Sequence, residues 1–206
     1  MRFRKGKEPS DLRRWRSRNP DERSWEALNA EVKGRMRAAL SRDQGGACCY
    51  CYGPAEAGSR IEHIDARTAQ NILAWDNLAL ACSGGEGLPP GDHHCDKKKA
   101  DRSLDVVHPY RNPVIGLVKV VSNGRLKGYR DNESLRTDIE DVLGLDTRRL
   151  VNARKQAIAT AAAGLPGRAW TAKRLGEVLD GLRSGGTPMP HQAWVEQWLA
   201  AKVASR

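Results

Sequence analysis

The chain has 206 residues, a net charge of +10 and an isoelectric point of about 9.7. Its mean hydropathy of −0.64 and the lack of any apolar run of about 20 residues exclude a membrane span. The basic N-terminus, MRFRKGKEPS, has no apolar core of the kind that a secretory signal needs. Five cysteines, an odd number, argue against a disulfide framework and favour thiolate chemistry, so we expect a cytoplasmic protein.

Positive charge is concentrated at the start of the chain. Residues 1–18 carry eight basic and two acidic side chains. A balance of this kind favours a polyanionic partner, DNA or RNA, and a solubilising tail is the alternative. We therefore expect residues 1–45 to form a basic arm and a helix. The candidate nucleic-acid contacts in the arm are Arg13, Arg14 and Arg16.

The helix is expected between Pro20 and Arg42. Apolar residues recur there at spacings of three and four, which is the period of an amphipathic helix. These residues are Trp25, Leu28, Val32, Met36 and Leu40. The Gly45-Gly46 pair predicts the end of the helix and a tight turn into the cysteines.

Four cysteines predict a metal site. Their positions are Cys48, Cys51, Cys82 and Cys95. The first two have the C-x-x-C spacing, which lets two thiolates from one turn reach one ion. The second two converge with them only if the twelve-residue loop between them folds back. We expect a tetrahedral structural zinc around which a small scaffold folds.

Three residues near these cysteines leave alternatives open. His93 or His94 could replace one cysteine as a zinc ligand. Cys49 lies between two expected ligands, so its side chain should point away and behave as a small buried hydrophobe.

Residues 46–110 predict a strand, a loop, a second strand and a helix. The expected ranges are Arg60–Asp65, Asn77–Cys82 and Asp96–Leu104. Residues 111–206 predict a hairpin around Asn123-Gly124 and several helices. The hairpin strands are 114–121 and 125–129, and the helices are 134–143, 147–163, 171–182 and a last one with Trp194 and Trp198. The predicted class is α+β, mainly α, and a core shared across the 105–112 boundary remains open.

The residues between the cysteines suit phosphodiester hydrolysis. A neutral His63 can accept a proton from water. Glu62 and Asp96 offer hard oxygen ligands for catalytic Mg²⁺ or Mn²⁺, which would stabilise charge on the phosphate and leaving group. Lys99 could contact the phosphate, and the Asn77 amide could bridge the loop backbone and orient His63. Further basic candidates for nucleic-acid binding are Lys97, Lys98 and Arg102.

Adjacent strand residues point to opposite faces, so a shared site for Glu62 and His63 requires the strand to end or bulge at His63. The alternative is a structural histidine hydrogen-bonded beside the zinc site.

These residues resemble the HNH endonuclease superfamily, the ββα-metal nucleases, whose members typically read C-x-x-C, D-H, N-L and C-x-x-C-N/H-x-x-K. The matching positions are Cys48-x-x-Cys51, Glu62-His63, Asn77-Leu78, Cys82 and Cys95-Asp96-x-x-Lys99. The resemblance implies that His63 is the general base, that Glu62 and Asp96 hold the catalytic ion, and that four cysteines hold zinc. The chain departs from the family in Glu62, in Asp96 and in the split second cysteine pair.

A narrower resemblance covers roughly residues 1–160. The segments QGGACCYC, RIEHI, WDNLALAC and HCDKKK look like the PtuB-type HNH proteins of prokaryotic Septu and retron-associated antiphage systems. That resemblance implies a PtuA-type ABC ATPase as a partner that gates the nuclease. Two alternatives remain, a stand-alone restriction or nicking HNH nuclease and a non-catalytic zinc module that binds nucleic acid.

Overall fold

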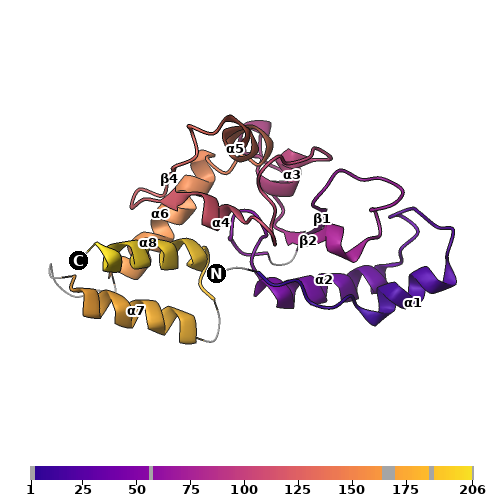
Figure 1. Cartoon of the computed structure of the whole chain (residues 1–206), viewed down its shortest axis with the longest axis horizontal. Coiled ribbons are helices and arrows are strands. Elements are labelled where there is room, and N and C mark those ends of the chain that lie inside the picture. Colours follow the sequence, from indigo (N-terminus) through magenta and orange to yellow (C-terminus); the bar gives the residue numbers. More distant parts are fainter. Residues whose placement is uncertain (1–2, 56–57, 164–169, 186–187, 206) are drawn as a thin grey trace.

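The computed structural model describes residues 3–55, 58–163, 170–185 and 188–205. This part of the chain is α+β and mainly helical, with two small antiparallel sheets of two strands each (Figure 1). The predicted structural class is therefore confirmed. Within these ranges, no helix has both the length and the apolar character needed to cross a membrane.

The N-terminal region contains two helices, where one was predicted. Helix α1 spans Ser10–Arg18 and α2 spans Ala30–Gln44. The expected start of the second helix near Pro20 is wrong, because the Asn29 side chain accepts a hydrogen bond from the Val32 amide at 2.9 Å and begins the helix there. Gly45, at φ +60°, ends it as predicted.

The basic N-terminus packs against the body of the protein. Leu12 of α1 has no exposed surface and belongs to the core that α2 covers. Phe3 stacks on Tyr52 with ring centroids 4.9 Å apart, and the Trp75 indole donates a hydrogen bond to the Gly6 carbonyl at 2.9 Å. Residues 3–18 therefore form part of the folded structure, and the alternative of a free solubilising tail does not hold for them.

The central sheet pairs β1 (Arg60–His63) with β2 (Leu78–Ala81) in antiparallel register. Every residue of β2 is buried, and its side chains alternate between two cores. Leu78 and Leu80 lie in the core beneath α1 and α2, whereas Ala79 and Ala81 lie in the core of the cysteines and C-terminal helices. The side chain of Gln44 exchanges two hydrogen bonds of 2.8 Å with the Leu80 backbone.

After β2, the short helix α3 spans Cys95–Lys99, which is about half of the predicted range. Helix α4 (Val114–Leu117) occupies the first half of the first predicted hairpin strand, so the prediction is wrong there. The hairpin itself consists of β3 (Lys119–Val120) and β4 (Leu126–Lys127).

The predicted turn at Asn123-Gly124 is present. Gly124 has φ +80°, and a Cβ there would clash with the Val151 carbonyl oxygen. This close contact seats the turn on α6 (Arg148–Ala163).

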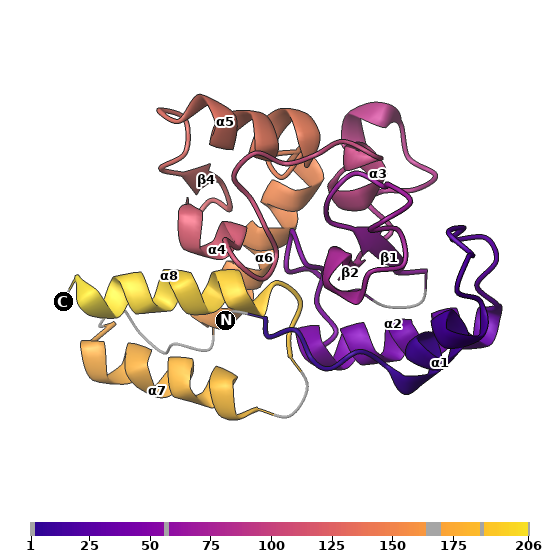
Figure 2. The ribbon, with the colours of Figure 1, turned by 45° about the vertical axis from the view of Figure 1, so that its right-hand side comes forward.

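The C-terminal region supplies α5 (Glu133–Arg136), a π-helical segment (Thr137–Val142), α6, α7 (Ala172–Ser184) and α8 (Gln192–Ala204). Helices α7 and α8 lie side by side in both views (Figures 1 and 2). Trp194 of α8 is fully buried, and its indole donates a hydrogen bond of 2.8 Å to the Cys51 carbonyl. The cysteine turn and the last helix therefore belong to one core, which crosses the boundary predicted at 105–112.

Candidate functional site

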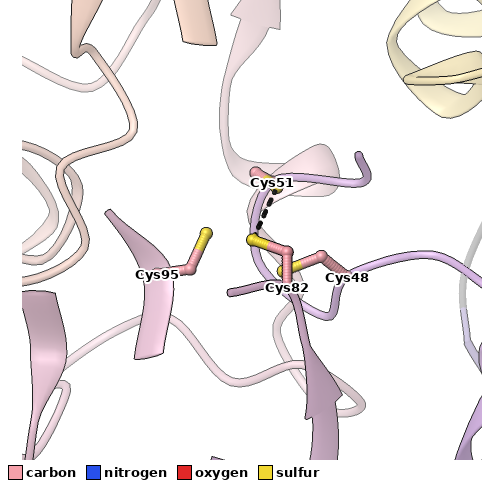
Figure 3. Close-up of side chains that lie close together, drawn as sticks. All are labelled: Cys48, Cys51, Cys82 and Cys95. Atoms are coloured by element: carbon pink, nitrogen blue, oxygen red, sulfur yellow. Dashed lines mark hydrogen bonds between the residues drawn. The ribbon is translucent and has the colours of Figure 1, made fainter. Parts of the chain in front are cut away.

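Four cysteine thiols converge between the central sheet and the C-terminal helices. The sulfur atoms of Cys48, Cys51, Cys82 and Cys95 all lie within 4.8 Å of one another (Figure 3). A tetrahedron of Zn–S bonds of about 2.3 Å places its sulfurs about 3.8 Å apart. The Cys51 and Cys82 sulfurs are 3.8 Å apart, and none of the cysteines forms a disulfide in the described residues. The cluster has the donor set and the spacing to hold a metal ion such as zinc.

Backbone contacts explain why a split cysteine pair still converges. The His94 amide donates a hydrogen bond of 2.9 Å to the Gly84 carbonyl, which closes the loop between Cys82 and Cys95. Gly84 has φ +65°, and a Cβ there would clash with the His94 carbonyl. Cys95 itself adopts φ +52°, and its amide donates to the Leu143 carbonyl at 2.7 Å.

Three residues near the cluster, His93, His94 and Cys49, were singled out by the sequence. The His93 ring is hydrogen-bonded through Nε2 to the Leu88 carbonyl at 2.9 Å, and His93 does not belong to the group of four sulfurs. His94 Nδ1 lies 3.3 Å from the Cys95 sulfur, beside the cluster. Cys49 lies outside the group of four and is buried among apolar residues, as predicted.

A polar pocket of about 470 Å³ opens beside the central sheet. Glu62, His63 and Asp96 all line it. Strand β1 ends at His63, as expected, but His63 is still paired with Leu78 of β2. All four residues of β1 line the pocket, so the pocket runs along the strand and adjacent side chains reach it from either face. The structure therefore brings together the three residues that the sequence analysis placed at a reaction centre.

His63 is held in a defined tautomer. Its Nε2 is 2.9 Å from the Ile72 carbonyl oxygen. Because a carbonyl only accepts, Nε2 carries the proton and Nδ1 keeps its lone pair. Burial lowers the pKa of His63 below its ordinary value, and the hydrogen bond to Ile72 opposes this shift. Both features favour the neutral imidazole with its lone pair on Nδ1.

Glu62 is a buried acid with three polar neighbours. Its Oε1 accepts a hydrogen bond from the Tyr50 hydroxyl at 2.9 Å and lies 3.0 Å from the Lys99 ammonium. Burial raises the pKa of Glu62 well above its usual value, the adjacent Asp96 carboxylate adds to the rise, and Lys99 opposes it. Glu62 and Asp96 therefore lie close enough for their charges to interact, and each also has a basic partner, Lys99 and Arg60 respectively.

The structure corrects the expected role of Lys99. Its side chain has no exposed surface, so the predicted contact with a phosphate is wrong for this arrangement. The ammonium also donates a hydrogen bond of 2.8 Å to the His63 carbonyl. Lys99 therefore holds both the Glu62 side chain and the backbone at the end of β1 in place.

Asn77 makes the bridging contacts that were predicted. Its Oδ1 accepts from the Asp65 amide at 2.8 Å, and its Nδ2 donates to the Asp65 carbonyl at 3.3 Å. Its own carbonyl accepts from Ile64 at 2.9 Å. These bonds close the loop between β1 and β2, which also carries the Ile72 carbonyl that holds His63.

Two of the basic residues near α3 serve the fold. The Arg102 guanidinium donates to several backbone carbonyl oxygens, including that of Val142 at 3.2 Å. Lys98 donates to the Glu140 carbonyl at 2.8 Å. Both side chains therefore hold backbone segments together, and their contact with nucleic acid stays a prediction. Lys97 lines the pocket.

The arginines of α1 also differ from one another. Arg13 and Arg14 are exposed, as a nucleic-acid contact requires. Arg16 pairs with Glu8 and donates to the Leu73 carbonyl at 3.2 Å, so it anchors α1 to the body instead.

Several pocket residues were missed by the sequence analysis. They are Trp25, Lys33, Arg37 and Arg67, together with Tyr50 beneath the pocket. Lys33 and Arg37 are four residues apart on α2, a spacing that places them on one helical face. That spacing was visible in the sequence, but nothing in it indicated that this face turns toward β1.

We expect Cys48→Ala to lose zinc and Cys49→Ala to retain it. Both side chains are buried and both changes remove one sulfur, but only Cys48 belongs to the group of four. Zinc content by mass spectrometry and the midpoint of thermal unfolding check this. Equal zinc content in the two variants would remove Cys48 from the metal site.

Lys99→Met should lower the free energy of unfolding by about 1–3 kcal/mol, because it leaves the buried Glu62 side chain and the His63 carbonyl without the ammonium that bonds both. Adding Glu62→Gln should recover part of the loss. Lys97→Met, on the same helix but partly exposed, should change stability by about 0.5 kcal/mol or less. Urea denaturation measures all three, and equal effects of the two lysine changes would contradict the buried pair.

No family model and no curated protein matches this chain.

Proposed function

We propose that the chain is a metal-dependent HNH-type endonuclease that hydrolyses phosphodiester bonds of nucleic acid. The observation that carries the proposal is the convergence of His63, Glu62 and Asp96 on one pocket beside a cysteine cluster. The order strand, strand, short helix around that pocket also agrees with the expected ββα-metal core.

In this proposal His63 is the general base. Its Nδ1 takes the proton from the attacking water, while the Ile72 carbonyl holds the ring in the required tautomer and orientation. Asn77 keeps the Ile72 loop closed, and Lys99 supports the end of β1. Both are positioning residues.

Glu62 and Asp96 would hold a catalytic Mg²⁺ or Mn²⁺. The fit rests on two oxygen-donor groups in a polar pocket, close enough that one raises the pKa of the other. The ion would supply Lewis-acid stabilisation of charge on the phosphate and leaving oxygen. The four cysteines would hold a separate structural zinc.

The charge around the pocket favours a polyanionic substrate. Lys33, Arg37 and Arg67 line it, and Arg13 and Arg14 are exposed on α1. Cations arranged in this way attract the phosphate backbone of DNA or RNA without selecting a sequence.

We expect His63→Ala to lower cleavage of plasmid DNA or RNA in Mg²⁺ or Mn²⁺ by about 10²–10⁴-fold, since a positioned base contributes about that factor. Zinc content and nucleic-acid binding should not change. His93→Ala is the control, because His93 is also bonded to a backbone carbonyl but does not line the pocket. Full cleavage by His63→Ala would eliminate the general base. Binding without cleavage by the unaltered chain would favour the non-catalytic zinc module.

A cytoplasmic role in prokaryotic antiphage defence, with a PtuA-type ABC ATPase as the gating partner, is also proposed. It rests on the resemblance over roughly residues 1–160. If the neighbouring open reading frame encodes an ABC ATPase of this type, its co-expression with the chain should give a complex that co-elutes in size-exclusion chromatography. Separate elution, or the absence of such a neighbouring gene, would favour the stand-alone nuclease.

A further inference from the structure

Trp25 lies at the rim of the reaction pocket. The sequence analysis assigned it to the apolar face of a helix, but it stands in the turn before α2 and lines the pocket with His63. The two rings make an edge-to-face contact with centroids 4.8 Å apart. Trp25 is only partly buried.

The turn that carries Trp25 is braced. The Glu22 carboxylate accepts hydrogen bonds from the backbone amides of Arg23 and Ser24 at 2.9 and 2.8 Å. The Leu28 amide donates to the Trp25 carbonyl at 3.3 Å, and Leu28 is buried in the core beneath α2. The indole is therefore presented to the pocket by a fixed turn.

Cations surround the indole. The Lys33 ammonium lies 5.4 Å from the centre of the Trp25 ring, and Arg37 lines the same pocket one turn further along α2. A lysine on a flexible stem can leave the ring for a phosphate, which uncovers the aromatic face that it now shields. A phosphate held by Lys33 would thus bring its own nucleobase to Trp25.

The acids that line the pocket do not cancel the attraction of Lys33 and Arg37 for a phosphate. Asp101 is paired with Arg67 at 3.1 Å, and Asp96 is paired with Arg60 at 3.3 Å. Glu62 is paired with Lys99. The cations of α2 thus face acids that already have basic partners.

We propose that Trp25 is a stacking platform for an unpaired nucleobase next to the phosphate in the His63 pocket. The proposal rests on the proposed nuclease function and names its substrate class, which is single-stranded or locally unpaired nucleic acid. Within a continuous duplex both faces of each base are covered by its neighbours, so only unpaired, terminal or extruded nucleotides offer a face to an indole.

The test is a cycle of two proteins and two ligands. The full chain and its Trp25→Ala variant are titrated with a labelled dT12 oligonucleotide and with a fully abasic twelve-residue chain of the same charge. Calcium replaces magnesium, and a gel verifies that the ligand stays intact. Trp25→Ala should weaken dT12 binding by about five- to a hundredfold, the range for one stacked base. It should change binding of the abasic chain by less than about twofold, since no base is present to stack.

Two control variants sharpen the cycle. Trp25→Phe should keep most of the dT12 affinity, because a ring remains. Trp15→Ala should leave it unchanged, because Trp15 is a partly buried tryptophan packed against the same core that does not line the pocket. Loss of dT12 affinity in Trp15→Ala would assign the effect to a disturbed fold and overturn the inference.

Cleavage and binding results separate this inference from the nuclease proposal. Unchanged dT12 affinity in Trp25→Ala, equal losses for both ligands, or no preference of the unaltered chain for dT12 would each overturn the stacking platform. A lower kcat with unchanged dT12 affinity would leave Trp25 as a positioning residue for His63, with the nuclease intact. The expected binding cycle without cleavage in Mg²⁺ or Mn²⁺ would reject the hydrolysis and retain the platform.

Discussion

The burial of strand β2 on both faces is the constraint on which the rest of the structure depends. Leu78 and Leu80 fix the N-terminal helices on one side, and Ala79 and Ala81 fix the cysteine core on the other. Small alanines on the second face let the cysteine turn approach closely. Strand β2 also positions both candidate sites. Its register with β1 places Glu62 and His63, and Cys82 follows directly at its end. A shift of one residue would exchange the two faces and separate both candidate sites.

The buried group of Glu62, Lys99 and Tyr50 lies directly beneath the pocket. A carboxylate and an ammonium in the interior lose their hydration, which good geometry and additional hydrogen bonds only partly repay. Here Lys99 repays it by bonding the His63 carbonyl as well as Glu62. Burying this ion pair lowers stability, but it fixes the end of β1, where Glu62 and His63 line the same pocket. Such a cost is usual at sites that bind ions or carry out chemistry.

The excess positive charge divides into structural and available cations. Arg16, Lys98 and Arg102 donate to backbone carbonyls and hold elements together. Lys33 of α2 faces the pocket instead, and Arg37 lines it while its Nε donates to the Ser59 carbonyl at 3.2 Å. Helix α2 therefore supplies one wall of the candidate active site, together with the tryptophan at its rim. This links the basic N-terminal region to the proposed chemistry more closely than a mobile phosphate-binding arm would.

The sequence by itself determined the donor chemistry and the order of the central strands and the helix that follows them. The C-x-x-C spacing, the Glu-His dipeptide and the apolar strand LALA were sufficient to predict the cysteine cluster, the central strands and the candidate residues. Only the tertiary structure decided which groups face one another. Trp25 was assigned to a helix because its spacing fits the period, but Asn29 caps the helix later and leaves the indole at the pocket. Lys99 was predicted to contact the phosphate, but packing between distant segments buries it against Glu62. Local propensity acts over a few residues, whereas burial depends on contacts between segments far apart in the chain.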